Sequence, residues 1–437
     1  MDASSVKYQF LVRCQHPGAI KVSTEFHSGT LLGRSKTGRH PSFFASSLRL
    51  SVIRARDRGL KVVDLAVIGA GLSGCALLAA LRRRGWKGSI LLLEAGRGAG
   101  GRCATRRRRD DDSWRLDHGS PTLSFSQAPQ GELANLIASL QRDDVLRPDD
   151  APVVGVDHLG QQVPPPDHLL LSGPRWRGTP TMASVAEALL AQGDDAVEAR
   201  FGERITTLRH DGSVWHLTGD HHARALVLSG TLLAHPRSLA MLGWQHVPLR
   251  EAVPAGVDLQ LDLALQQIAG LEASVRWNLM LELPEVSDHH VPRQIWLTAQ
   301  AQERFGVERL VLHPQQDQRL GLVVHGLDDG AVITPDSQPE LLRFHEQHLI
   351  KAISDLVQPW PALREALAHA RSLGVMRWGA AQPLHQGLSA DLQWCHQTRV
   401  GFCGDWIEGR GFGMAEGALQ SAVNLAARIS GSSIAER

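Results

Sequence analysis

The order of apolar runs after residue 61 predicts a strand, a helix and a second strand. The run 62–68 is rich in β-branched residues and predicts a buried strand. The apolar stretch 75–81 ends in three arginines and a glycine, which are typical of the C-terminus of a helix. A second apolar run, 89–93, predicts another buried strand and leads into Glu94. This order predicts an α/β fold with a parallel sheet.

Further strands and one helix are predicted before residue 240. Residues 204–208 and 214–217 lie on either side of Asp211-Gly212 and predict two strands of a β-meander. Residues 225–229 predict a core strand that returns to the parallel sheet. The apolar stretch 183–191 predicts a helix.

The pattern changes beyond residue 240. Alternating runs at 256–263 and 294–297 predict half-buried antiparallel strands. Residues 341–357 have the clearest amphipathic helical pattern of the chain. These segments predict a second, α+β domain of mostly antiparallel sheet, and no internal repeat is visible.

Composition excludes several classes of protein. With 437 residues the chain should hold two or three compact units at roughly 100–200 residues per domain, and 43% hydrophobic residues are ordinary for a globular protein. The five cysteines are scattered without a C-x-x-C pair, so neither a disulfide framework nor a cysteine metal site is expected, and a reducing compartment fits best. The net charge is +1, but the part after residue 61 is net −7, which argues against a nucleic-acid partner.

Residues 1–61 form a different kind of sequence. They carry 11 Lys/Arg against 3 Asp/Glu and are rich in serine. This segment is predicted to be an organellar presequence or an upstream stretch that is not normally translated, with a folded domain as a weaker alternative. We therefore expect a cytoplasmic protein, or an organellar one if the segment is a presequence.

A membrane span is not expected. The longest uncharged stretch, 65–81, has seventeen residues, and three glycines in its first ten residues break the helical pattern.

The turn between the first two predicted elements has the pattern G-x-G-x-x-G, at Gly69, Gly71 and Gly74. Gly69 permits a tight turn, Gly71 lets the backbone approach a pyrophosphate, and Gly74 lets helix and strand pack closely. Glu94 lies twenty residues later and would accept hydrogen bonds from an adenosine ribose. A carboxylate there would repel a 2′-phosphate, so NADP is disfavoured, and the choice between NAD and FAD stays open from this motif alone. An ordinary βαβ unit with a glycine-rich turn is the weaker interpretation.

Two further segments carry a family resemblance. Gly100-Gly101-Arg102 follows Glu94, and near the C-terminus Gly404-Asp405 ends a short apolar run before an apolar helix. In both segments the sequence resembles flavoproteins of the glutathione-reductase-type superfamily, whose amine-oxidase branch has an acid and then G-G-R on this loop. The resemblance implies FAD as the cofactor. It also implies that Arg102 reaches the FAD phosphates and that Asp405 binds the ribityl chain.

The resemblance extends to a turn beside the flavin ring and to the meander. The segment 117–122 resembles the D-x-G-x turn that these enzymes place beside the isoalloxazine, and Ile205 would contact the adenine. It implies these cofactor-binding residues: Gly69, Ala70, Gly71, Leu72, Ser73, Gly74, Glu94, Gly101, Arg102, Gly119, Thr122, Ile205, Gly404, Asp405, Gly417 and Ala418.

More narrowly, the order of segments resembles renalase-like oxidoreductases. It includes 178–182 before the helix, the meander, and Arg377-Trp378 before the final turn, although 179–181 lacks a glycine that the pattern would have. Catalytic residues are unknown, and Arg377, Trp378 and Trp406 are candidates for the substrate pocket.

The resemblance implies a division into a Rossmann-type FAD-binding domain and an inserted α+β substrate domain. The FAD-binding domain is expected to comprise 62–128, 178–240 and 396–437. The substrate domain is expected to comprise 129–177 and 241–395.

We therefore expect an FAD-dependent oxidoreductase that accepts a hydride from a small organic substrate onto flavin N5 and is reoxidised by oxygen, with a reduced nicotinamide isomer as one candidate donor. Ordinary amine oxidation is less expected, because the chain after residue 61 has two lysines, Lys87 and Lys351, and no tyrosine. An amine, carotenoid or porphyrin-precursor oxidase remains an alternative, as does a flavin-binding sensor without turnover. The oligomeric state stays open.

A metal hydrolase with histidine ligands is the remaining alternative. The chain has 21 histidines, and 345–348 (His-Glu-Gln-His) is one residue short of a zinc-protease motif. We interpret these residues as scattered surface histidines and expect no metal. Cys403 is interpreted as a buried strand cysteine.

Overall fold

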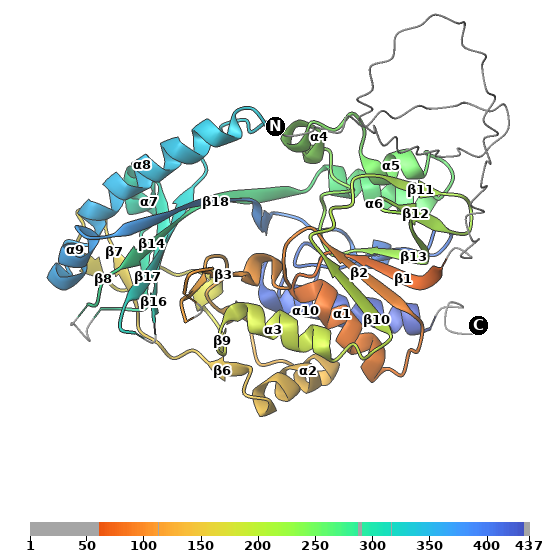
Figure 1. Cartoon of the computed structure of the whole chain (residues 1–437), viewed down its shortest axis with the longest axis horizontal. Coiled ribbons are helices and arrows are strands. Elements are labelled where there is room, and N and C mark those ends of the chain that lie inside the picture. Colours follow the sequence, from red (N-terminus) through yellow and green to blue (C-terminus); the bar gives the residue numbers. More distant parts are fainter. Residues whose placement is uncertain (1–60, 112, 287–290, 316, 432–437) are drawn as a thin grey trace, which may run out of the picture. The chain divides into compact units, whose positions relative to one another are not determined.

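The strand–turn–helix–strand unit at the start of the body forms as the sequence predicts. It consists of β1 (Val62–Ile68), α1 (Leu72–Arg83) and β2 (Ile90–Glu94), with β1 and β2 parallel. In this computed structural model, residues 61–111, 113–286, 291–315 and 317–431 are described (Figure 1). The prediction for residues 1–61 therefore lies outside the described residues, Lys61 excepted.

The first sheet has eight strands and is built around this unit. Strands β10, β2, β1 and β13 are parallel neighbours. Next to them, β12 pairs antiparallel with β13 and β11 pairs antiparallel with β12, while β20 pairs parallel with β13 and β19 pairs antiparallel with β20. Its strands after β2 are β10 (Val197–Phe201), β11 (Leu208–His210), β12 (Trp215–Leu217), β13 (His221–Leu228), β19 (Trp394–Cys395) and β20 (Val400–Phe402). Segments from both ends of the described body thus meet in one sheet.

Helices cover both faces of this sheet because the strands are apolar on both sides. Leu65 and Val67 of β1 face a core shared with α1, α2 (Gly131–Arg142), α3 (Met182–Ala191) and α10 (Ala415–Ser430). Ala66, between them, faces the opposite core, which includes α5 (Pro248–Ala252) and α6 (Leu259–Ala269). The short helix α4 (Arg237–Leu242) precedes α5.

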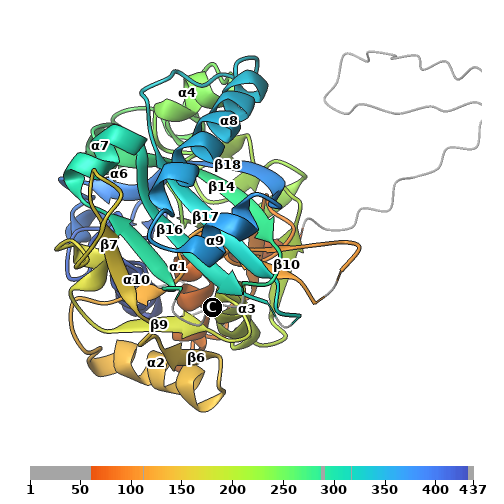
Figure 2. The same cartoon turned by 90° about the vertical axis from the view of Figure 1, so that its left-hand side faces the viewer.

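The second sheet has seven strands, in the order β18-β14-β17-β16-β15-β7-β8, and is antiparallel except between β15 and β7. Its strands are β7 (Val153–Val156), β8 (Gln162–Val163), β14 (Glu272–Leu283), β15 (Gln294–Leu297), β16 (Val307–Pro314), β17 (Leu320–Leu327) and β18 (Arg371–Leu384). One face packs on α7 (Ala299–Phe305), α8 (Gln338–Leu356) and α9 (Pro361–Leu367) (Figure 2). Among the described residues, no helix covers the other face, which becomes important for the site.

Short strands connect the two larger sheets. β3 (Thr105–Arg107) pairs with β4 (Arg115–Asp117), and β9 (Arg175–Gly178) lies between β5 (Leu123–Ser124) and β6 (Leu146–Pro148). Single 3₁₀ turns occur at Gly101–Cys103, Leu169–Leu171 and Ala390–Leu392. The fold class expected from the sequence, a Rossmann-type sheet with a second, mostly antiparallel sheet, is confirmed.

One predicted strand is wrong. Residues 256–263 were expected to alternate as a strand, but Leu259–Ala269 is the helix α6. Asp258 caps this helix, since its carboxylate accepts hydrogen bonds from the backbone N–H groups of residues 260 and 261. The buried residues fall at helical spacing: Leu261, Ala264, Leu265 and Ile268. The cap and the later apolar positions override the short alternation.

The first meander strand is also displaced. The sequence predicts it at 204–208, whereas β11 begins at Leu208. Ahead of it, the backbone N–H groups of Thr206 and Thr207 donate to the hydroxyl of Thr218 instead of pairing in a ladder. Side-chain bonding by threonine therefore delays the start of the strand.

The division into cofactor and substrate domains stays a prediction. The described residues from Lys61 onward form one compact unit. Within it, α2 and α6, which the sequence assigns to the substrate domain, pack in the two cores of the first sheet. No helix of the described residues is long and apolar enough to cross a membrane.

Candidate functional site

A cavity of about 420 Å³ lies beside the carboxyl ends of β1 and β2, where open parallel sheets place their ligands. Loops of the first sheet form one side of it, and the helix-free face of the second sheet forms another. The predicted site residues that line the cavity are Gly69, Gly71, Leu72, Ser73, Glu94, Gly101, Arg102, Gly119, Thr122, Trp378, Asp405, Trp406 and Ala418. Residues more than 300 positions apart thus share one cavity.

The glycine turn is built for close packing. A Cβ atom on Gly74 would overlap the carbonyl oxygen of Gly69, so only glycine lets α1 approach the end of β1 this closely. Gly71 occupies the N-cap position of α1 and has no side chain to cap it. The N-terminus of α1 is therefore open toward the cavity for an anion.

Glu94 holds this turn and lines the cavity as well. One of its carboxylate oxygens accepts the backbone N–H of Ala70 at 2.8 Å, and the other accepts that of Gly96 at 2.6 Å. The carboxylate is thus fixed at the end of β2, where an adenosine ribose is expected. Ala70 itself serves the site through its backbone.

The predicted G-G-R loop lies directly against the glycine turn. Gly100 donates its N–H to the carbonyl of Ala70 at 2.8 Å and forms a bridge with Gly71. A Cβ atom on Gly101 would lie 2.9 Å from the Cα atom of Gly71, and Gly101 has a φ of 55°. The two loops therefore make one glycine-rich floor.

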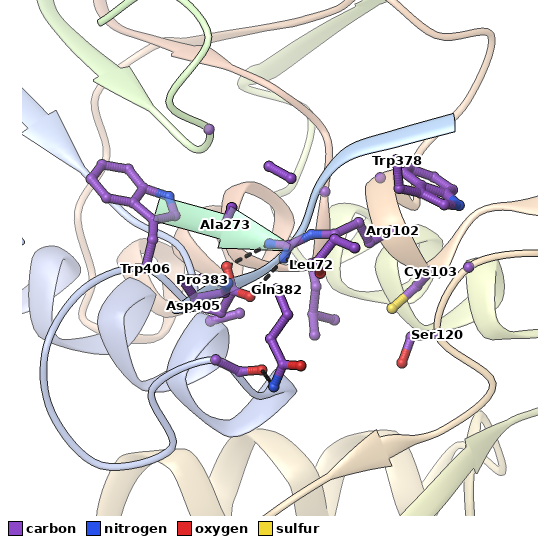
Figure 3. Close-up of a pocket in the computed structure, with 18 of the residues that line it drawn as sticks. Leu72, Arg102, Cys103, Ser120, Ala273, Trp378, Gln382, Pro383, Asp405 and Trp406 are labelled. Atoms are coloured by element: carbon purple, nitrogen blue, oxygen red, sulfur yellow. Dashed lines mark hydrogen bonds and ion pairs between the residues drawn. The ribbon is translucent and has the colours of Figure 1, made fainter. Parts of the chain in front are cut away.

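Arg102 and Asp405 form a two-pronged ion pair across this floor (Figure 3). Nη1 of Arg102 lies 2.6 Å from Oδ2 of Asp405, and Nη2 lies 2.5 Å from Oδ1. Nη1 also donates to the carbonyl of Ala381 at 3.0 Å. The side chain of Asp405 is 8% exposed and that of Arg102 is 36% exposed. The sequence predicts a role for each residue toward the cofactor, but not their pairing.

The predicted ring-binding turn lies beside Trp378. The indole of Trp378 stacks on the imidazole of His118 with ring centroids 5.5 Å apart. A Cβ atom on Gly119 would overlap the carbonyl oxygen of Arg102, so this turn also packs tightly on the G-G-R loop. Trp406 and Trp378 lie on opposite sides of the Arg102–Asp405 pair (Figure 3).

Four of the predicted residues support the site without lining the cavity. Gly417 packs against the carbonyl of Gly411, and Gly404 donates its N–H to the hydroxyl of Ser421. Gly74 lets α1 pack against the end of β1, and Ala70 donates its backbone N–H to Glu94.

Ile205 and Arg377 also lie away from the cavity lining. Ile205 is buried in the core behind the first sheet. Arg377 belongs to the opposite face of β18 from Trp378, and its guanidinium lies 5.4 Å from the ring centre of Trp277. The structure therefore does not bring Arg377 together with the other site residues.

One wall of the cavity, which the second sheet supplies, is not predicted from the sequence. This wall consists of Arg276 and Asn278 of β14, Glu308 and Arg309 of β16, and His325 of β17. All five lie on the sheet face that carries no helix. Alternation along β14 is the signal that was available, since Trp277, Leu279 and Leu281 face the apolar core while Arg276 and Asn278 face the cavity.

The interpretation of the histidines as surface residues is wrong for several of them. His118, His313, His325 and His345 are at most 7% exposed. His345, in the motif resembling a zinc protease, stacks on Trp277 with centroids 3.9 Å apart. Among the described residues, no group of three or more His, Cys, Asp or Glu side chains could hold a metal ion.

Burial shifts the acid–base behaviour of the groups behind the cavity. Burial and the positive charge of nearby arginines together lower the pKa of His118 to about 4 and that of His313 to about 3. Burial also raises the pKa of Asp117 to about 6, although hydrogen bonds from Thr105 and from the backbone of Met182 oppose the shift. These histidines are therefore neutral near pH 7.

The described cysteines are buried free thiols: Cys75, Cys103, Cys395 and Cys403. Burial raises the pKa of Cys103 and of Cys403 to about 12. Thiols of this kind are poor nucleophiles.

Comparisons with known proteins agree with the architecture. Residues 67–140 match the family of NAD(P)-binding Rossmann-like domains. None of the curated proteins compared with the sequence matches it.

Several solved structures share the fold over most of the chain. A candidate protoporphyrinogen oxidase from an Exiguobacterium species has a TM-score of 0.56 at 13% identity, covering 85% of this chain and 99% of that one. Cyclohexylamine oxidase from Brevibacterium oxydans has a TM-score of 0.55 at 15% identity, covering 85% and 99%. Wild-type putrescine oxidase bound to putrescine has a TM-score of 0.53 at 13% identity, covering 85% and 100%. At such identities the likeness establishes the fold and not the substrate.

Proposed function

We propose that the protein is an FAD-dependent oxidoreductase that accepts a hydride from a small organic substrate and passes the electrons on to oxygen. The observation that carries the proposal is the convergence of the glycine turn, Glu94, Arg102 and Asp405 on one cavity that continues to the helix-free face of the second sheet. A simple dinucleotide-binding domain has no need of the last two residues or of the second sheet. The oxidases that share the fold are consistent with this function.

The residues present fit FAD. Gly71 and Gly101 both line the cavity and approach so closely that a Cβ atom on Gly101 would lie 2.9 Å from the Cα atom of Gly71. The uncapped N-terminus of α1 offers backbone N–H groups to the pyrophosphate, and Glu94 offers its carboxylate to the ribose. The N-terminus of α10 has no side-chain cap either, and its residues Met414, Ala415 and Ala418 line the cavity.

Arg102 and Asp405 would hold the middle of the cofactor. The guanidinium is a planar donor that suits phosphate oxygens, and the carboxylate is an acceptor that suits ribityl hydroxyls. In the structure each group satisfies the other, so cofactor binding exchanges part of this ion pair for contacts with the ligand. The cavity thereby keeps its charges compensated before the cofactor binds.

When bound, FAD supplies the hydride-accepting ring, which no side chain of the chain can replace. The protein contributes position and a dry environment. Trp378 and the turn 117–122 wall the end of the cavity where the ring is expected, and Trp406 walls the other side. The nearby His118 is neutral, and among the described residues no lysine lines the cavity. The protein therefore suits a substrate that can release a hydride without help from a strongly basic side chain.

The renalase-like order of segments makes a reduced nicotinamide isomer the first substrate to test. Such a donor leaves as an aromatic ring, so it needs no strong base to release its hydride. Amine oxidation is the second candidate, because two oxidases of amines share the fold. The two lysines after Lys61, Lys87 and Lys351, are both exposed and lie away from the cavity.

Spectroscopy of the purified protein tests the proposal. We expect a yellow protein that releases FAD on denaturation and whose visible flavin absorbance bleaches when a reduced nicotinamide isomer is added without oxygen. Recovery of NAD, or of no nucleotide, from well-folded protein would overturn the cofactor assignment. A flavin that no nicotinamide or amine reduces would instead indicate a sensor without turnover.

A further inference from the structure

The cavity face of the second sheet carries a continuous row of polar side chains. Asn278 of β14 pairs in register with His325 of β17, His325 pairs with Arg309 of β16, and Arg309 pairs with Trp296 of β15. Side chains at paired positions lie side by side on one face of a sheet. Three neighbouring strands therefore present an amide, an imidazole and a guanidinium to the cavity together.

Each of these three groups has a buried polar atom without a hydrogen-bond partner among the described residues: Oδ1 of Asn278, Nε2 of His325 and Nε of Arg309. The residues are 1%, 3% and 7% exposed. The amide of Asn278 is oriented, since its Nδ2 donates to the carbonyl of His118 at 2.8 Å. Buried polar atoms without partners are costly, and such atoms normally have partners in native proteins. Three of them in one row, all lining a cavity, point to a ligand.

The charges in this wall favour an anion. Glu308 pairs with Arg276 at 2.5 Å and lies 3.9 Å from Arg309, so one carboxylate is shared by two guanidinium groups. A register shift between Val307 and Arg309 adds one residue to β16 at this point, and Glu308 and Arg309 both line the cavity as a result. His325 adds no charge, because burial and the adjacent arginines lower its pKa well below the ordinary value. With two guanidinium groups and one carboxylate, this wall therefore carries a net charge of +1.

Of the other charged groups that line the cavity, Arg237 and Glu94 carry opposite charges and cancel in its net charge. His168, which faces Glu308 and Trp296, is also kept neutral by burial. Glu272 lies at the rim, where its side chain is 70% exposed. The Arg102–Asp405 pair is neutral as a unit.

We infer that the wall formed by Asn278, His325 and Arg309 binds the carboxylate of a small organic substrate. The inference rests on the proposed function, because it names the class of molecule that this oxidoreductase oxidises. The guanidinium of Arg309 would meet the carboxylate, and Asn278 and His325 would complete its hydrogen bonds or hold a neighbouring polar group. Trp378, also in the cavity lining, would contact the hydrocarbon part. A cationic amine would instead meet the excess positive charge.

Binding of benzoate to the full-length protein tests the inference without any turnover. Benzylamine and benzamide have the same ring with a positive and a neutral group, so the three probes isolate the effect of charge. Isothermal titration calorimetry reads binding whether or not flavin is bound. We expect benzoate to bind at least tenfold more tightly than either of the other probes. Equal binding of the three, or no binding of benzoate, would overturn the inference.

Variants locate the site. Arg309→Met should weaken benzoate binding about tenfold to hundredfold, as expected for loss of a charge-assisted hydrogen bond. Arg309→Lys keeps the charge without the planar fork, so its affinity for benzoate should lie between those of the wild-type protein and Arg309→Met. Arg304→Met is the control, since Arg304 is an exposed arginine of α7, which packs on the other face of the sheet. An unchanged affinity in Arg309→Lys and Arg309→Met would place the anion elsewhere.

Folding and flavin content are measured on the same samples, which separates the two proposals. If Arg309→Met does not fold, the preference of the wild-type protein for benzoate over benzylamine and the Arg309→Lys variant still decide. A protein that binds benzoate through Arg309 but holds no flavin would contradict the proposed function and leave the carboxylate site standing. A flavoprotein that does not prefer benzoate would contradict only the carboxylate site.

Discussion

The ion pair between Arg102 and Asp405 is the feature whose removal should be most informative. Arg102→Ala removes two hydrogen bonds to the carboxylate and one to the carbonyl of Ala381. Hydrogen bonds to charged groups contribute about 1.5–3 kcal/mol. Because the Arg102 side chain is 36% exposed, solvent screens part of this, and we expect the free energy of unfolding of the flavin-free protein to fall by about 2 kcal/mol.

Flavin affinity should fall as well, because Arg102 is expected to bond the pyrophosphate. A loss of about 1.5–3 kcal/mol in binding corresponds to roughly tenfold to hundredfold weaker affinity at ~1.4 kcal/mol per decade. Arg102→Lys should recover part of the affinity, since it keeps a charge without the planar fork. The assay is titration of flavin-free protein with FAD, followed by the quenching of flavin fluorescence, together with urea unfolding.

Arg107→Ala is the matched control. Arg107 lies five residues away on β3 and pairs with Glu187, with both side chains about half exposed. Such exposed pairs contribute about 0–1 kcal/mol. A double-mutant cycle of Arg102→Ala with Asp405→Asn should show non-additive effects on stability, since the two side chains contact each other directly. Equal flavin affinity of the Arg102 and Arg107 variants, with an additive cycle, would refute the reasoning about this loop.

Four further predictions concern folding and pH. Deletion of residues 1–61 should leave flavin content and the thermal midpoint nearly unchanged, because the strand that leads into the glycine turn begins at Val62; a large drop in flavin occupancy would contradict this. Gly74→Ala should cost about 1–3 kcal/mol in urea unfolding and lower flavin occupancy, because the new Cβ overlaps the carbonyl of Gly69. Asp258→Ala should cost about 2–4 kcal/mol in the same assay, since the buried carboxylate caps α6 and also binds the N–H and hydroxyl of Thr398; a loss below that of a surface variant would argue against the cap. Burial lowers the pKa of His118 from 6.5 to about 4, so the unfolded chain binds a proton that the folded protein does not, and stability should be full above pH 6.5 and fall toward pH 4; His118→Gln should flatten this slope.

The sequence predicts the first sheet well because its signals are local. The run 62–68, the glycine turn and Glu94 follow one another within one βαβ unit, and each has a physical role that its neighbours reinforce. The wrong strand at 256–263 shows the limit of the same reasoning. A short alternation fits a strand and the first turn of a helix equally well, and only the cap at Asp258 with the later apolar spacing decides.

The cofactor half of the site could be anticipated, since glycines and charged residues at special turns leave a recognisable pattern. The cavity wall formed by the second sheet could not, because it depends on which strands become neighbours. Asn278, His325 and Arg309 lie on three strands, and nothing in the local sequence states that they pair in register. The register shift in β16 adds to the difficulty, since a strict period of two would send Glu308 and Arg309 to opposite faces, whereas both line the cavity. The pairing of Arg102 with Asp405 is hidden for the same reason, because two residues that each suggest a ligand contact give no sign in the sequence that they contact one another. The role of a residue that depends on non-local neighbours can therefore be recognised only from the structure. This holds even where the residue stands out in the sequence as a charge or a histidine.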